Sequence, residues 1–250
     1  MRRLAGGTHA STHLVTTASP EREVVLRRFP PGDEAASAEA RVLTALGGLD
    51  GFAPTLLAAD LAGQQAGRPA VLITRLPGQA DIMPAQPDGW AAQLGHALAR
   101  VHAVPVGGLA GFRDVMDGET SALAGAPRVL THFDYWSGNV LWESGVLSGV
   151  VDWSGAALAP RGFDLGWCRL DLALLFGDSV AADLFLAAYQ DACGLAVGDM
   201  AQWDLHATLR SRHDVEDWLP NYHDLGRTDL SRGELRRRHS AWARRRLGAL

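Results

Sequence analysis

The sequence predicts an α+β protein of two lobes, with its strands early in the chain and its helices late. Apolar and β-branched runs closed by Pro and Gly precede Pro77, whereas Ala- and Leu-rich segments with helical spacing follow Pro160. A chain of 250 residues with 47% hydrophobic residues can fill a sizeable core. We expect residues 1–76 to form a smaller lobe and residues 77–250 a larger one.

Two strands and one helix are predicted in the first lobe. Residues 23–29 are apolar and β-branched and end at a Pro-Pro-Gly turn, which indicates a strand. Residues 35–46 are rich in Ala and Leu and stop at two glycines, which is typical of a helix end. Residues 69–74 predict a second strand, and the Arg-Leu-Pro-Gly break at 75–78 marks the boundary between the lobes.

The second lobe begins with a predicted helix at residues 90–104 that carries apolar residues on one face. A strand at 129–131 leads into a polar segment at residues 132–139, and residues 140–151 have the pattern of a hairpin. Further helices are predicted at residues 165–175, 179–193, 200–213 and 234–246.

The polar segment and the hairpin contain oxygen-bearing side chains in a spacing that suits phosphoryl transfer. This chemistry needs a carboxylate beside the attacking hydroxyl and oxygen ligands for Mg²⁺. Asp134 and Asn139 lie five residues apart in one loop, and the hairpin returns the chain so that Asp152 comes close to Asn139. Each residue alone has a structural explanation as a turn or cap, but together they favour a catalytic site.

Three segments carry a resemblance to a known family: THFDYWSGNVL at 131–141, GVVDW at 149–153 and FDL at 163–165. They resemble the aminoglycoside phosphotransferase family, a branch of the protein-kinase-like fold. The resemblance implies a small antiparallel-sheet amino-terminal lobe that binds a nucleotide, ATP or GTP. It also implies a larger, mainly helical carboxy-terminal lobe that carries the catalytic and acceptor-binding residues.

The resemblance also implies roles for single residues. Asp134 corresponds to the catalytic base, Asn139 and Asp152 to the ligands of Mg²⁺, and Asp164 to a residue that supports the loop. We expect His132 to hold the loop by hydrogen bonding rather than to transfer protons.

The nucleotide-binding lobe departs from related kinases because the chain has no lysine, and all 23 of its basic residues are arginines. Related kinases use a strand lysine that pairs with a helix glutamate and binds phosphates. Arg27 with Glu39 is the best candidate for such a pair here, and Arg28 is the alternative, since strand alternation points only one of them inward.

Gly6 and Gly7, followed by small polar residues, are the candidate loop over the phosphates, since such a loop lets backbone N–H groups approach an anion. They lie so near the amino terminus that a preceding strand has almost no room. The sequence therefore indicates an abbreviated lobe.

The acceptor is expected to be a small hydroxyl compound that carries positive charge. Residues 164–226 contain eleven acidic residues against three arginines, a net charge of −8, and an acidic cleft attracts cations. Solvated helix faces explain most of these charges better than an acceptor site does. The acceptor-binding candidates are His213, Asp214, Asp217, Trp218, Tyr222 and Asp224.

The charge distribution and the cysteine count argue against other classes of protein. Residues 227–250 carry a net charge of +6 and residues 1–226 carry −11, and no nucleic-acid recognition motif accompanies the basic end. Two cysteines in apolar surroundings indicate neither a disulfide framework nor a zinc site. Without an apolar run of membrane-spanning length, we expect a cytoplasmic protein with no membrane or nucleic-acid partner.

The sequence therefore predicts a magnesium-dependent phosphotransferase that acts on an aminoglycoside-like antibiotic, with resistance as its consequence, or on a cationic metabolite. One alternative is a kinase for choline, a sugar or homoserine. Another is a kinase-like fold that binds a nucleotide or ligand without catalysis, which the absent lysine and the short glycine loop favour.

Overall fold

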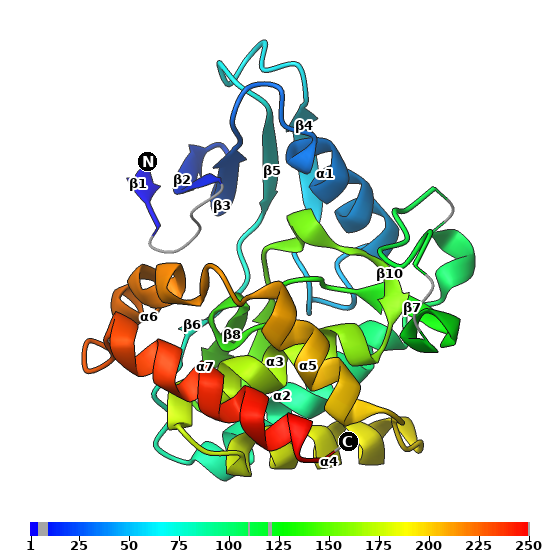
Figure 1. Ribbon diagram of the computed structural model, residues 1–250. Helices are drawn as coiled ribbons and strands as arrows, with labels where there is room; N and C mark the ends of the chain where they lie inside the picture. The colour runs from blue at the N-terminus through cyan, green and yellow to red at the C-terminus, as the bar shows by residue number, and fades with distance from the viewer. Residues whose placement is uncertain (5–9, 110, 120–121, 250) are drawn as a thin grey trace.

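The computed structural model describes residues 1–4, 10–109, 111–119 and 122–249. A β-sheet with one helix forms the upper part of the molecule in Figure 1, and most of the helices form the lower part. This arrangement confirms the predicted two-lobed α+β architecture.

The amino-terminal sheet has five antiparallel strands in the order β1-β2-β3-β5-β4. Its first strand has only two residues. Helix α1 (Ala35–Leu46) has the predicted bounds and packs on the sheet through buried residues such as Val42 and Leu43. The strands are β1 (Arg2–Arg3), β2 (Ser11–Ala18), β3 (Glu21–Arg28), β4 (Leu56–Asp60) and β5 (Ala70–Thr74).

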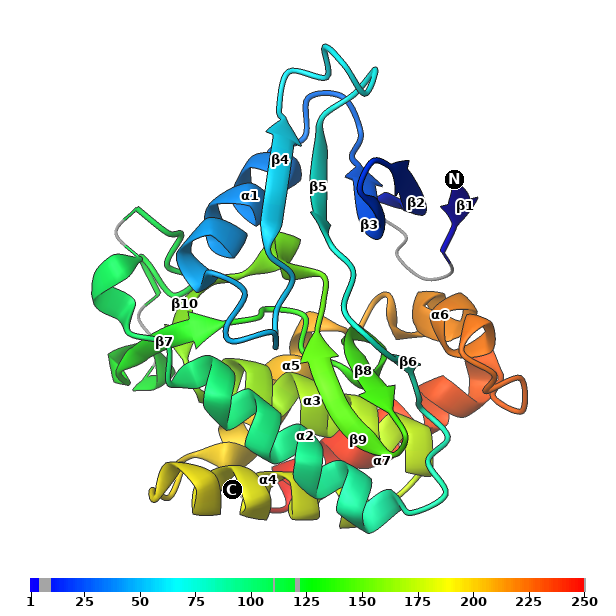
Figure 2. The ribbon, with the colours of Figure 1, turned by 180° about the vertical axis from the view of Figure 1, so that it is seen from behind.

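Two small sheets follow, and they lie below the amino-terminal sheet in Figure 2. In the first, the predicted hairpin forms and pairs with a short strand that follows the boundary segment. In the second, two strands flank the polar segment and the hairpin. The strands are β6 (Gln79–Ala80), β8 (Val140–Glu143) and β9 (Val146–Val150) in the first sheet, and β7 (Arg128–Thr131) and β10 (Ala157–Pro160) in the second.

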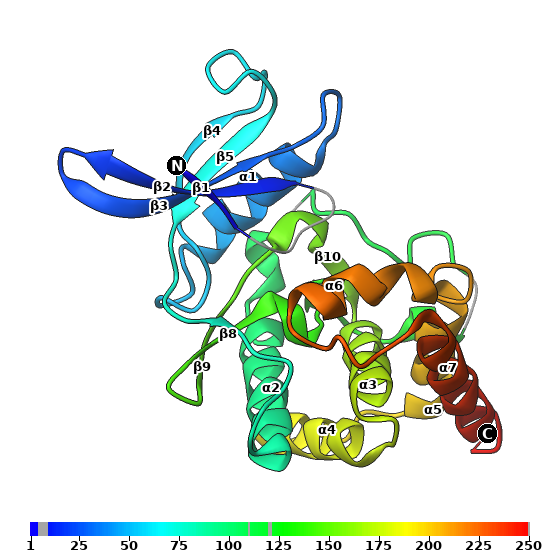
Figure 3. The ribbon, with the colours of Figure 1, turned by 90° about the vertical axis from the view of Figure 1, so that its left-hand side faces the viewer.

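Helices build the rest of the second lobe, as the side view in Figure 3 shows. They are α2 (Pro87–His102), α3 (Gly162–Phe176), α4 (Val180–Cys193), α5 (Met200–Arg210), α6 (Leu219–Asp224) and α7 (Arg232–Leu247). Helix α5 ends at Arg210, three residues before the predicted end at His213, and the Ser211 hydroxyl donates to the carbonyl oxygens of Ala207 and Thr208. Five short 3₁₀ helices occur in the described residues: η1 (Val106–Gly108), η2 (Ala122–Gly125), η3 (Ser137–Asn139), η4 (Trp153–Gly155) and η5 (Val215–Trp218).

Helix α3 forms the centre of the helical lobe. Almost every residue of α3 is buried, and it contacts α4, α5 and α7. Helices α2 and α4 approach so closely that a Cβ atom on Gly95 would lie 2.4 Å from the Phe185 carbonyl oxygen. These packed helices hold the polar segment in place on the side of the helical lobe that faces the amino-terminal sheet.

Candidate active site

The polar segment after β7 is held in place by one buried carboxylate. Asp164, at the start of α3, accepts hydrogen bonds from the backbone N–H of His132 at 2.7 Å and of Phe133 at 2.9 Å. Phe133 adopts a φ of 74°, which is rare for an aromatic residue. The two bonds to Asp164 offset the strain of this conformation, and the next residue, Asp134, is thereby aimed away from the core.

Two histidines reinforce the same region. His132 is fully buried, and its Nε2 lies 2.9 Å from the Val151 carbonyl oxygen, so Nε2 carries the hydrogen. This bond ties the polar segment to the end of the hairpin. His102, from α2, lies 3.3 Å from Asp164 and 2.7 Å from the Tyr189 hydroxyl, and burial lowers its pKa.

Asp134 is half-buried at the edge of a cavity, and two donors position its carboxylate. The Trp167 indole N–H donates to Oδ1 at 3.0 Å, and the Asn139 side-chain amide lies 3.2 Å from Oδ2. Burial raises the pKa of Asp134 despite the opposing effects of His132 and the Trp167 hydrogen bond. A carboxylate with a raised pKa is a stronger base, which suits the abstraction of a hydroxyl proton.

Asn139 and Asp152 come together because of the hairpin register. Val140 pairs with Val150, and the Val151 N–H donates to the Asn139 carbonyl oxygen at 2.9 Å, so Asp152 is the next residue along. Asp152 has a left-handed backbone with φ 66°. It stands at the point where the chain leaves the hairpin for 3₁₀ helix η4.

Gly138 serves this loop in a way that the sequence does not reveal. It lies in the tight turn of 3₁₀ helix η3, where the Asn139 N–H donates to the Trp136 carbonyl oxygen at 3.0 Å. A Cβ atom there would lie 2.2 Å from the Trp136 ring, so the glycine makes room for the indole.

The oxygens of Asn139 and Asp152 fit a magnesium ion. The Asn139 amide nitrogen faces Asp134, which leaves its side-chain oxygen for other ligands. Mg²⁺ is commonly held by one or two carboxylates together with water and substrate phosphates. Among the described residues no group of three or more His, Cys, Asp or Glu side chains has the geometry of a metal site, so such an ion would rely on phosphate and water for its remaining ligands.

Arg27 links the amino-terminal sheet to this site. Its Nη1 lies 2.7 Å from Glu39 Oε1, and its Nη2 lies 2.6 Å from Asp152 Oδ1. Burial acts to raise the pKa of Asp152, but the charge of Arg27 and the hydrogen bonds from Arg27 and Ser154 outweigh it, and the pKa falls. Burial, helped by the charge of Asp152, raises the pKa of Glu39 to about 7 despite its pairing with Arg27.

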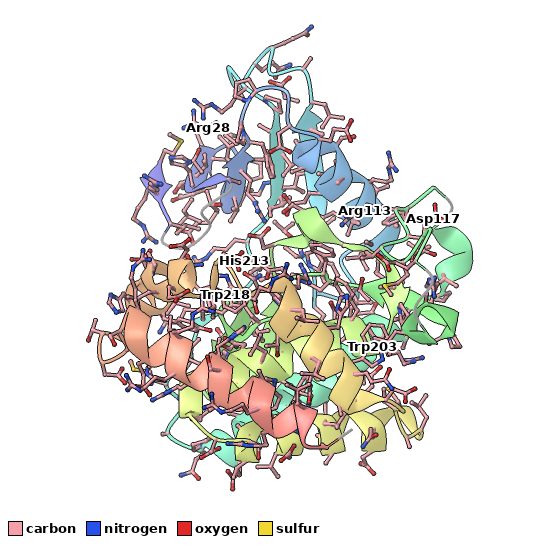
Figure 4. All side chains as sticks on the ribbon, in the orientation of Figure 1. Arg28, Arg113, Asp117, Trp203, His213 and Trp218 are labelled. Carbon is pink, nitrogen blue, oxygen red and sulfur yellow. The ribbon has the colours of Figure 1, made fainter. Side chains whose placement is uncertain are left out.

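Of the two candidate arginines, Arg27 is therefore the one that faces the site. Arg28 is less deeply buried and lies on the outer part of the upper lobe in Figure 4. Gly6 and Gly7, the candidate phosphate loop, lie outside the described residues.

A cavity of about 210 Å³ opens beside Asp134. Its lining combines aromatic rings and carboxylates from the polar segment, from α3 and from the region of η5 and α6. The lining residues are Asp134, Trp136, Trp167, Asp171, Trp218, Asn221 and Tyr222.

The structure divides the six acceptor candidates into two groups. Trp218 and Tyr222 line the cavity, whereas His213, Asp214, Asp217 and Asp224 do not. Asp217 instead forms an ion pair with Arg232 at 3.0 Å. His213 and Trp218 both lie on the side of the helical lobe that faces the sheet (Figure 4).

Sequence reasoning missed Trp136, Trp167 and Asp171 of the cavity, although a signal for two of them exists. Trp167 and Asp171 follow Asp164 by three and seven residues, which places all three on one face of a helix. Arg210 was also missed: its guanidinium lies 4.1 Å from the Trp167 ring centroid and 4.2 Å from that of Phe133. Burial lowers the pKa of Arg210, although the charge of Asp134 opposes this effect.

Solved structures with this arrangement define the class of the fold. A candidate aminoglycoside phosphotransferase from Ralstonia eutropha is 15% identical, with a TM-score of 0.68 over 99% of this chain and 91% of that one. A mutant of aminoglycoside 2'-phosphotransferase IIIa in complex with GDP is 16% identical, with a TM-score of 0.60 over 99% and 89%. A thermostable mutant of aminoglycoside phosphotransferase APH(4)-Ia, in a ternary complex with ADP and hygromycin B, is 14% identical, with a TM-score of 0.57 over 97% and 92%. The fold is thus the α+β kinase-like fold, with an amino-terminal antiparallel sheet and a carboxy-terminal helical lobe.

The chain belongs to the phosphotransferase enzyme family, whose model matches residues 1–125 and 119–206. No curated protein sequence matches it significantly. Among the described residues, no helix combines the length and the apolar composition that a membrane crossing requires.

Proposed function

We propose that this protein transfers the γ-phosphoryl group of ATP or GTP to a hydroxyl of a small cationic acceptor. The observation that carries the proposal is the convergence of Asp134, Asn139, Asp152 and Arg27 next to a cavity that Asp134 itself lines. These groups come from both lobes, as the transfer of a group between two bound substrates requires.

Each residue has one role in the proposed reaction. The acceptor oxygen forms a bond to the γ-phosphorus while the bond from that phosphorus to the bridging oxygen breaks. The hydroxyl proton passes to Asp134, and the products are a phosphate ester and the nucleoside diphosphate. Asn139 and Asp152 hold Mg²⁺, which when bound neutralises charge on the phosphate oxygens.

Asp164 and His132 support the reaction without touching the reacting atoms. Asp164 fixes the backbone before Asp134, and His132 joins that backbone to Val151, next to Asp152. Together they hold the base and the metal ligand at a constant separation.

Arg27 takes the part of the missing lysine in the proposal. A guanidinium offers five N–H donors, and Arg27 directs one from Nη1 to Glu39 and one from Nη2 to Asp152. Its Nε is buried and has no hydrogen-bond partner among the described residues. In this proposal the second N–H groups of Nη1 and Nη2 and the positive charge serve the phosphates, with Glu39 as the anchor of the side chain. Gly6 and Gly7 complete the phosphate site in this proposal.

Nucleotide binding is assigned to residues 1–76, and catalysis and acceptor binding to residues 77–250. Relatives of this fold are found with ADP and with GDP, which supports a purine nucleotide without choosing between ATP and GTP. Since nucleoside triphosphates are maintained in the cytoplasm, we place the reaction there.

The acceptor in this proposal is an aminoglycoside-like antibiotic, in which case the protein confers resistance, or a cationic metabolite. Hygromycin B in a structure of the same fold supports the first choice. The two carboxylates of the cavity support a positive charge in either case.

A test of the reaction uses Asp134→Ala. Mass spectrometry of a panel of hydroxyl compounds incubated with Mg-ATP or Mg-GTP should reveal a gain of one phosphoryl group. Asp134→Ala should lower kcat by roughly 10²–10⁴-fold while nucleotide binding remains, because a general base contributes about that much. Asp191→Ala, an exposed aspartate at the end of α4, is the matched control. Undiminished turnover by Asp134→Ala would exclude it as the base.

A second candidate function is a non-catalytic binding module. Two observations favour it: Arg27 forms an ion pair with Asp152, the candidate metal ligand, and the chain has no lysine. A nucleotide that raises the melting temperature without any phosphorylated product would support this function over the first.

A further inference from the structure

A half-buried guanidinium lies near the candidate base without an ion-pair partner. Arg210 is the last residue of α5, and within the described residues its side chain forms neither an ion pair nor a hydrogen bond. Taking a charge out of water without a partner is costly, so a group left in this state calls for an explanation.

Three aromatic rings hold the Arg210 guanidinium. Its Cζ atom lies 4.1 Å from the centroid of the Trp167 ring, 4.2 Å from that of Phe133 and 4.8 Å from that of Phe163. Such contacts attract the charge but use none of the five N–H donors in ordinary hydrogen bonds. The rings therefore orient the side chain and leave its donors for a ligand.

The same rings place this charge close to Asp134. Phe133 precedes Asp134 in the chain, and the Trp167 indole N–H donates to Asp134 Oδ1 at 3.0 Å. Burial lowers the pKa of Arg210, and the charges of Asp134 and Asp164 oppose this effect although neither carboxylate forms an ion pair with it. An unpaired cation thus stands beside the carboxylate that receives the hydroxyl proton in the proposed reaction.

A second guanidinium lies over the same phenylalanine. The Cζ atom of Arg113, in the segment between η1 and η2, is 4.7 Å from the centroid of the Phe133 ring, and no carboxylate of the described residues forms an ion pair with it. The charge of Arg113 acts to lower the pKa of Arg210, so the two cations repel each other. An anion beside them would offset this repulsion and accept their free donors.

Phosphoryl transfer brings an anion to this place. The oxygen that gives its proton to Asp134 is the one that bonds to the γ-phosphorus, so the transferring group passes close to Asp134. Negative charge is spread over its equatorial oxygens in the transition state, and an arginine that contacts them stabilises that charge. Arg27 approaches from the sheet, whereas Arg210 belongs to the helical lobe, which the phosphoryl group approaches as it leaves the nucleotide.

We propose that Arg210 is a catalytic residue that donates hydrogen bonds to the non-bridging oxygens of the phosphoryl group during its transfer, with Arg113 adding positive charge. The bonds that form and break are those of the proposed reaction, and Arg210 neither gains nor loses a proton. The inference rests on the proposed function. Arg210 lies outside all three motif segments and beyond residue 206, where the match to the family model ends, so it is a feature of this chain.

The first experiment needs no acceptor, because it compares two ligands at the nucleotide site. Mg-ADP with aluminium fluoride imitates the transferring phosphoryl group, whereas Mg-ADP alone does not; Mg-GDP is tested in the same way. In calorimetric titration of the full-length protein, Arg210→Met should weaken binding of the aluminium fluoride complex by roughly 10²-fold, as expected when one transition-state donor is lost. The affinity for Mg-ADP alone should change by less than about twofold, which also shows that the variant is folded.

Two further variants separate charge from packing. Methionine fills the space over the rings without a charge, so a role in packing alone would leave the affinity of Arg210→Met for the complex unchanged. Arg210→Lys keeps the charge but not the planar fork, and it should recover part of the lost affinity. Arg212→Met is the matched control: its exposed side chain, two residues further on, donates to the Leu209 carbonyl oxygen, and the change should alter neither affinity.

The second experiment is a kinetic one with any acceptor that the protein phosphorylates. Arg210→Met should lower kcat with little change in either KM, because the contact forms only as the phosphoryl group moves. A rise in the KM of the acceptor, with undiminished binding of the aluminium fluoride complex, would mean that Arg210 binds an anionic group of the acceptor and would overturn the inference.

The outcomes for the inference differ from those for the proposed function. Wild-type protein that binds no aluminium fluoride complex and phosphorylates no compound would reject the phosphotransferase, and the role of Arg210 with it. Wild-type protein that binds the complex no more tightly than Arg210→Met would reject the role of Arg210 alone.

Discussion

At the scale of single residues, the most unusual group is a guanidinium shared between two carboxylates. Arg27 contacts both Glu39 and the half-buried Asp152, so one positive charge serves two carboxylates. Burial of Glu39, helped by the charge of Asp152, raises the pKa of Glu39 although Arg27 opposes this effect.

Glu39 should therefore make the stability of the protein depend on pH. Its pKa is about 7 in the folded protein against an ordinary value of 4.5. Between these values the folded state retains a proton that the unfolded state releases, so stability falls as pH rises from about 4.5 to about 7, by up to about 3 kcal/mol. Glu39→Gln should abolish this part of the fall in urea denaturation measured across that range. The exposed Glu34→Gln at the start of the same helix should leave it intact, and an unchanged pH profile in Glu39→Gln would contradict the argument.

Asp164 is the second residue on which the site depends. Asp164→Asn replaces one acceptor oxygen with an NH₂ group that faces a backbone N–H donor, and we expect a loss of about 3 kcal/mol in the free energy of unfolding. Asp183→Asn makes the same chemical change at a side chain that is 57% exposed and forms an ion pair with Arg169, so it should cost less than about 1 kcal/mol. Chemical denaturation of both variants measures the difference, and equal losses would refute the role of Asp164.

At the scale of elements, helix α3 organises the active-site side of the helical lobe. One of its faces presents Asp164, Trp167 and Asp171 to the polar segment and the cavity. Its carboxy-terminal end is capped from outside the helix: Arg238 donates to the carbonyl oxygens of Leu174 and Leu175 at 2.7 and 2.8 Å. Helix α7 thus docks on α3 through a cation at the negative end of its dipole.

This docking can be tested within one helix. Arg238→Ala should lower the free energy of unfolding by about 1–2 kcal/mol because two carbonyls lose a charged donor. Arg237→Ala, one residue away with a side chain that is 72% exposed, should change it by less than about 0.5 kcal/mol. A thermal or urea unfolding series that ranks the two variants equally would show that the Arg238 cap does not contribute to the docking of α7.

Helices and strands with strong local sequence patterns were predicted well, whereas those with weak sequence patterns were missed. Helix α1 has the predicted bounds because Ala and Leu fill it and Gly47 ends it with a left-handed residue. Strands β2 and β4 escaped prediction because most of their residues are only partly buried, so their patterns lack clear alternation. The two-residue β1 and β6 are shorter than any periodicity can reveal.

At the scale of the whole molecule, the candidate site was predictable where its members share one loop or hairpin. Asp134, Asn139 and Asp152 span only a short stretch of chain, and the hairpin determines their approach. The cavity brings together the polar segment, α3 and α6, and the packing of these elements depends on contacts that no local pattern encodes. For the same reason, the charges of Asp214, Asp217 and Asp224 indicated an acidic region without showing which side chains face the cavity.

Ligand binding across the two lobes should raise the stability of the whole molecule. Mg-ATP or Mg-GTP at about 100 times its Kd should add about 2.7 kcal/mol to the free energy of unfolding, because only the folded state binds it. Asp152→Ala should remove most of the increment that Mg²⁺ adds over nucleotide with EDTA, whereas Asp191→Ala should retain it. Thermal shift assays measure both increments, and a full magnesium increment in Asp152→Ala would place the metal elsewhere.

The bridge from Arg27 to Asp152 has a mechanical consequence. It joins strand β3 to the end of the hairpin, 125 residues away along the chain. A wider angle between the lobes would therefore break this ion pair and leave the half-buried Asp152 carboxylate without it. The ligand-free protein should accordingly sample a narrow range of hinge angles, and its radius of gyration in small-angle X-ray scattering should change little when nucleotide is added. Arg27→Met removes the Arg27–Asp152 ion pair and should therefore broaden the range of hinge angles.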